Sequence, residues 1–64
     1  DRKDMERRLA ALDSEHRDLD DVIARLAEDS RPDQLRIRRL KKRKLTLKDE
    51  ITQLRSALLP DIIA

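Results

Sequence analysis

The apolar residues of this chain recur in alternating steps of three and four on both sides of Pro32. This spacing places them along one stripe of an α-helix, because seven residues make about two helical turns. The sequence contains no glycine, and no proline lies within either stretch, so nothing interrupts the two helical segments. The two stripes are Met5, Leu9, Leu12, His16, Leu19, Ile23 and Leu26 before the proline, and Ile37, Leu40, Lys44, Leu47, Ile51, Leu54 and Leu58 after it.

Pro32 and Pro60 set the expected ends of the helices. Pro32 lacks a backbone donor and disfavours helical geometry at the residue before it, so the first helix has to end there. Ser30 with Asp33 resembles a capping box, while Pro32 equally suits the first position of a second helix. We predict a single domain over residues 1–64, with a helix at about 3–29, a turn at about 30–33, a helix at about 33–59 and an apolar tail at 60–64.

The two stripes pair without a slip when the helices lie antiparallel about Pro32. The numbers of each facing pair then add to 63, from Leu26 opposite Ile37 to Met5 opposite Leu58. Seven layers in one register predict an all-α fold, an antiparallel two-helix coiled-coil hairpin.

Charged residues beside the stripes give a second test of this register. On one side of the seam the expected neighbours have opposite charge, whereas on the other side Glu15 faces Glu50, a like-charge pair that the register leaves unexplained. The expected pairs of opposite charge are Glu6 with Arg55, Asp13 with Lys48, Asp20 with Lys41, and Asp29 with Arg36 on the second side.

A chain of 64 residues has to stabilise itself without the usual supports of small domains. It has no cysteine for disulfides and one histidine, which is too few for a zinc site. Apolar residues outside the stripes suggest that a second hairpin packs on the first, giving a four-helix bundle dimer. We expect these residues to contact the second copy or another protein: Leu35, Leu45, Leu59, Ile62 and Ile63.

Two motifs carry a resemblance to a known family. Residues 15–26 follow the pattern EHxxLDxxIxxL, and residues 37–54 follow IxxLKKRKLxLKDEIxxL. Over about residues 12–54 the chain resembles the YdcH-like family of small bacterial proteins, a domain of unknown function. The resemblance implies a helical hairpin that associates into a dimer in the bacterial cytoplasm. It implies no activity and no catalytic residues, and the tail LLPDIIA lies beyond the family's pattern.

His16 and Lys44 are the polar members of the two stripes and are expected to form one polar layer within the seam. A histidine there is a candidate pH sensor, because imidazole titrates near neutrality. We favour a role in fixing register and association state, as single polar residues have in coiled coils. A general acid or base needs a pocket beside it, and we expect a thin hairpin to have none, so we predict no enzyme activity. We also expect no metal, cofactor or small-molecule substrate.

The basic run of the second segment offers an alternative function. Arg38, Arg39, Lys42 and Arg43 are candidates to bind a partner and could neutralise phosphates of a nucleic acid. Against this stand a net charge of only +2 and the absence of aromatic residues for stacking on bases. We therefore favour a protein partner over a nucleic acid.

The sequence as a whole predicts a non-enzymatic, homodimeric protein-interaction module. No apolar run approaches the roughly 20 residues needed to cross a bilayer, so we expect a cytoplasmic protein without a membrane span. The chain begins at Asp1 without an initiator methionine, so we expect that the N-terminus has been trimmed or that the sequence is a shortened form.

Overall fold

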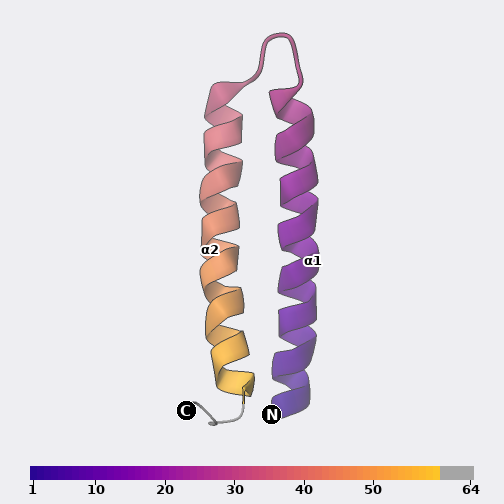
Figure 1. Cartoon of the computed structure of the whole chain (residues 1–64), viewed down its shortest axis with the longest axis vertical. Helices are drawn as coiled ribbons and strands as arrows, with labels where there is room; N and C mark the ends of the chain where they lie inside the picture. Colours follow the sequence, from indigo (N-terminus) through magenta and orange to yellow (C-terminus); the bar gives the residue numbers. More distant parts are fainter. Residues whose placement is uncertain (60–64) are drawn as a thin grey trace.

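The computed structural model describes residues 1–59 and consists of two α-helices lying side by side in opposite directions (Figure 1). Helix α1 spans Arg2–Ala27 and helix α2 spans Gln34–Leu58. The predicted all-α antiparallel hairpin is thus confirmed. The tail with Ile62 and Ile63 lies outside the described residues.

Aspartates cap the start of both helices. The carboxylate of Asp1 accepts a hydrogen bond from the backbone N–H of Lys3, at 3.3 Å. The carboxylate of Asp33 accepts one from the backbone N–H of Arg36, at 3.1 Å. Each carboxylate satisfies a donor that the first helical turn leaves without a partner. Neither Ser30 nor Pro32 holds the position that the sequence suggested, because Asp33 caps α2 and the helix begins at Gln34.

The stripe residues meet between the helices as the heptad pattern predicts. Every member of both stripes is buried or half-buried. Leu47 is fully enclosed and packs with Leu12 and Ile51, while Leu9, Leu19 and Leu54 lie against this cluster. Burial of one such side chain contributes about 1.5–3 kcal/mol, so the middle of the hairpin holds most of its apolar stabilisation.

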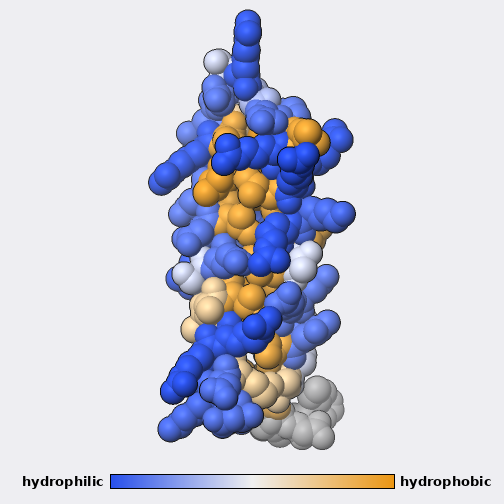
Figure 2. Space-filling view, turned by 180° about the vertical axis from the view of Figure 1, so that it is seen from behind, coloured by the Kyte–Doolittle hydropathy of each residue, from blue (hydrophilic) through white to orange (hydrophobic). Residues whose placement is uncertain are grey.

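The hairpin is a single layer of helices. Its extents are 48 × 24 × 14 Å, so it is one helix thick along its shortest axis. Figure 2 shows the consequence, a stripe of apolar groups visible along the molecule between hydrophilic margins. Among residues 1–59 the fully or nearly enclosed side chains are only Leu12, Ile37, Leu47 and Ile51.

The ion pairs along the seam differ from the predicted neighbours. On one side, here called the lysine side, Asp13 pairs with Arg55 at 3.4 Å instead of Lys48, and Asp20 pairs with Lys44 instead of Lys41. Helical side chains lean toward the N-terminus of their own helix. In an antiparallel pair the side chains of the two helices lean in opposite directions. A side chain can therefore contact a residue of the other helix whose Cα atom is not level with its own.

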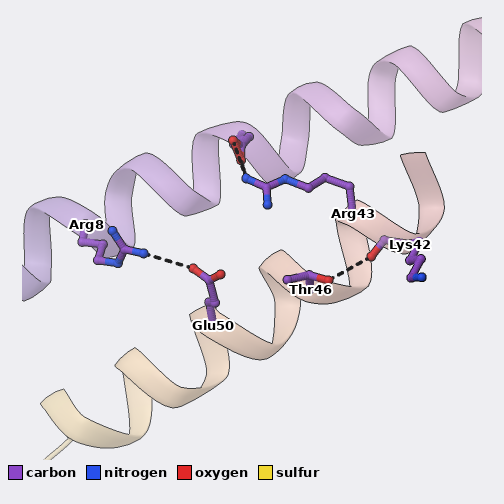
Figure 3. A network of polar contacts seen from close by, with 6 residues as sticks. Arg8, Lys42, Arg43, Thr46 and Glu50 are labelled. Atoms are coloured by element: carbon purple, nitrogen blue, oxygen red, sulfur yellow. Dashed lines mark hydrogen bonds and ion pairs between the residues drawn. The ribbon is translucent and has the colours of Figure 1, made fainter. Parts of the chain in front are cut away.

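The other side of the seam, here called the arginine side, resolves the predicted clash of Glu15 with Glu50. Arg43 of α2 binds Glu15 at 3.1 Å, and Arg8 of α1 binds Glu50 at 3.3 Å (Figure 3). Each glutamate is thus neutralised by a long arginine one heptad away. The like-charge pairing that the register predicted was therefore wrong for these side chains.

Candidate functional site

The polar layer in the seam contains three residues. The Lys44 ammonium forms an ion pair with one carboxylate oxygen of Asp20, and His16 Nδ1 lies 3.7 Å from the other. The hydrogen bond from Lys44, together with the positive charges of Lys44 and His16, lowers the pKa of Asp20, although desolvation acts in the opposite direction. Asp20, four residues after His16 on the same helix, thus joins the two residues that the sequence placed in this layer.

The imidazole of His16 is held with one nitrogen out of reach of any acceptor. Its Nε2 is buried and has no hydrogen-bond partner among the described residues. The 3.7 Å distance from Nδ1 to Asp20 is too long for a hydrogen bond. A buried polar atom without a partner lowers the stability of the fold. The layer therefore contributes less to stability than an apolar layer of the same volume would.

A solvent-open hollow of about 390 Å³ adjoins this layer on the lysine side. The expectation that the hairpin has no pocket beside His16 needs correction, because His16 is part of its lining. Single-layer packing leaves this space where a larger domain would place another helix. The other lining residues are Asp13, Lys44, Lys48, Ile51, Thr52 and Arg55.

The candidate basic face divides into two parts. All four of its residues are exposed, but Arg43 reaches across to α1 and donates hydrogen bonds to both oxygens of Glu15 (Figure 3). In the part of the chain that the structure describes, Arg38, Arg39 and Lys42 form no ion pair. These three cations are the portion of the face that remains available to a partner.

The exposed apolar residues do not form one surface. Leu35, Leu45 and Leu59 are 58%, 62% and 68% exposed. Leu45 and Leu59 occupy the same heptad position beside the lysine side, whereas Leu35 occupies a different position, on the outer surface of α2. Leu45 lines a second open hollow, of about 310 Å³, together with Lys41, Lys44 and Lys48. Sequence reasoning named Leu45 but missed the lysines around it.

Neither a metal centre nor a membrane segment is found in residues 1–59. No group of three histidine, cysteine, aspartate or glutamate side chains in this range is placed to hold a metal ion. Neither α1 nor α2 is long and apolar enough to cross a membrane.

A model of one protein family matches residues 9–55, which is most of the chain. The family is described as protein of unknown function (DUF465). The matched range contains both motifs on which the resemblance to YdcH-like proteins rests, and the two assignments agree. No curated protein and no solved structure matches the chain.

Proposed function

The chain belongs to the family of proteins of unknown function DUF465, and we propose that it is a non-enzymatic helical module that acts by binding protein, first of all a second copy of itself. As the resemblance implies, this role would be carried out in the bacterial cytoplasm.

The observation that carries this proposal is the half-open seam. The hairpin is 14 Å thick, and apolar groups of the seam remain visible along its surface (Figure 2). Stable domains bury their apolar stripes between two layers of secondary structure. A second helical layer would cover the seam and add the apolar burial that a chain of 64 residues lacks alone.

The surroundings of His16 support a role without catalysis. Its Nδ1 points toward Asp20 and its Nε2 is enclosed in the seam. The buried Nε2 is out of reach of a substrate, whereas a general acid or base needs a nitrogen within hydrogen-bond distance of one.

The test of self-association is the mass in solution. Light scattering and sedimentation over a range of micromolar concentrations should give twice the mass of one chain or more. A sharp monomer mass throughout this range would refute the proposal.

A nucleic acid is the second candidate partner, favoured by one observation. Arg38, Arg39 and Lys42 are exposed and, within residues 1–59, are not engaged by any carboxylate. If they bind phosphates, affinity for RNA or DNA should fall steeply with salt, by about one unit of log–log slope for each phosphate neutralised. No binding at low ionic strength would remove this candidate. The variant Arg38→Gln with Arg39→Gln should lose most of any binding seen, and Arg7→Gln with Arg17→Gln on α1 is its matched control.

A further inference from the structure

The lysine side of the seam has more positive charge than its own helices neutralise. Asp13 and Asp20 already pair with Arg55 and Lys44. Over the described range, Lys41 and Lys48 form no ion pair. They stand seven residues apart, which is about 10 Å along α2. An occupant of this side should therefore bring carboxylates at about the same spacing.

Two open hollows lie on the lysine side. They have volumes of about 390 and 310 Å³ and share Lys44 and Lys48 in their linings. The hollow found on the arginine side is smaller, at about 240 Å³. Leu45 lies between Lys41 and Lys48 and exposes 62% of its surface. An occupant that covers Leu45 gains apolar burial in addition to the ion pairs.

A second copy of this chain carries carboxylates with the required spacing. Glu6, Asp13 and Asp20 repeat every seven residues along α1 on the lysine side. Asp13 and Asp20 remain 35% and 47% exposed, and a carboxylate accepts several hydrogen bonds, so each can serve a second cation.

We propose that two copies stack through their lysine sides, related by a two-fold axis parallel to the helices, so that both turns lie at the same end. This inference rests on the proposed self-association and adds its surface and orientation. Each α2 then lies antiparallel to α1 of the other copy. Such an axis preserves height along the hairpin, so Lys41 comes within about one helical turn of the second copy's Asp20. Lys48 comes equally near the second copy's Asp13.

The charges of the two helices favour this arrangement over a dimer whose turns lie at opposite ends. If the turns lay at opposite ends, α2 would pack on α2 of the other copy, and the lysines would face lysines. Like charges across an interface cost several kcal/mol, whereas opposite charges fix the orientation. The face itself measures 48 by 24 Å, which is enough for the roughly 800 Å² per partner of a standard interface.

A distance between turns tests the orientation directly. Because the chain contains no cysteine, Ser30→Cys gives a single attachment point for a spin label at the turn. Pulsed electron–electron double resonance on the dimer should give a distance between the two spin labels near or below the 24 Å width of the hairpin. A distance near its 48 Å length would overturn the orientation while self-association stands. A monomer would refute the proposed function and this inference together.

A charge reversal tests the surface. Lys41→Glu with Lys48→Glu should raise the dimer dissociation constant about tenfold or more, as measured by sedimentation. The matched control Arg39→Glu with Lys42→Glu makes the same charge change on the outer surface of α2 and should leave the constant within about twofold. Mixing the lysine variant with Asp13→Lys plus Asp20→Lys should restore association as a heterodimer. Equal dimerisation of the lysine variant and its control would overturn the surface, and circular dichroism checks that each variant remains helical.

Discussion

Replacement of Leu47 by alanine should cost more stability than any other single leucine truncation in this hairpin. Leu47 is the one side chain among residues 1–59 with no exposed surface, and it packs against Leu12 and Ile51. The substitution leaves the backbone and the charge unchanged, so its effect reports on packing in the seam.

The expected magnitude follows from two contributions. Removing three buried carbons costs about 2.4 kcal/mol, at roughly 0.8 kcal/mol for each. A cavity adds up to about 2 kcal/mol where the surroundings cannot move. Here the layer is only 14 Å thick, so neighbouring side chains can close part of the space. We therefore expect a loss of about 2.5–3.5 kcal/mol, in the lower part of the known range for buried leucines.

The assay is urea unfolding followed by circular dichroism, at one protein concentration so that association contributes equally. Leu35→Ala is the matched control, because Leu35 lies on the same helix and is 58% exposed. It should change the free energy of unfolding by less than about 0.5 kcal/mol. Equal losses for the two variants would show that the heptad seam does not hold the hairpin together.

Three further predictions concern the caps and the polar layer. Asp33→Ala removes the acceptor for the Arg36 backbone N–H and should lower the free energy of unfolding by about 0.5–2 kcal/mol, while Asp49→Ala on the exposed surface of α2 should change it far less. The pKa of Asp20 is lowered in the folded state, so its ion pair stabilises the hairpin at pH values above the ordinary aspartate pKa. This stabilisation is lost as the pH falls through the pKa of the folded state. Lys44→Met should therefore flatten the dependence of the urea midpoint on pH in that acidic range. His16→Leu removes a buried nitrogen without a partner and should raise the free energy of unfolding by about 1–3 kcal/mol. If the polar layer fixes association state, adding Lys44→Leu to that variant should produce mixed oligomers by sedimentation, and one unchanged species would contradict the role.

The seam could be predicted from the sequence because burial on a helix depends on spacing, and spacing is visible in the chain. The stripe residues of both helices, from Met5 to Leu26 and from Ile37 to Leu58, are all buried or half-buried at the heptad positions assigned to them. The tight turn was equally readable, since Pro32 and Asp33 act through local backbone chemistry.

The ionic contacts were not predictable in the same way. Glu15 and Glu50 are level in the predicted register, yet each binds an arginine one heptad away. Their partners depend on the length and direction of side chains and on which cations compete for them, and heptad position does not determine these. The hollow rimmed by lysines around Leu45 was missed for the same reason, because its lining combines charged and apolar residues from one exposed helix face.

The antiparallel register also determines the order in which the hairpin can form. Leu26 and Ile37 are separated by a short loop, so their contact closes at a small entropic cost. Once one layer has formed, the next layer closes only a short additional length of chain. No contact between the helices therefore requires the distant ends of the chain to meet first. The ends meet last, where the Arg2 guanidinium donates to the carbonyl oxygen of Leu58 at 3.3 Å. Folding should therefore proceed as a zipper from the turn and be fast for a chain of this length, and unfolding should begin at the end where Arg2 and Leu58 lie.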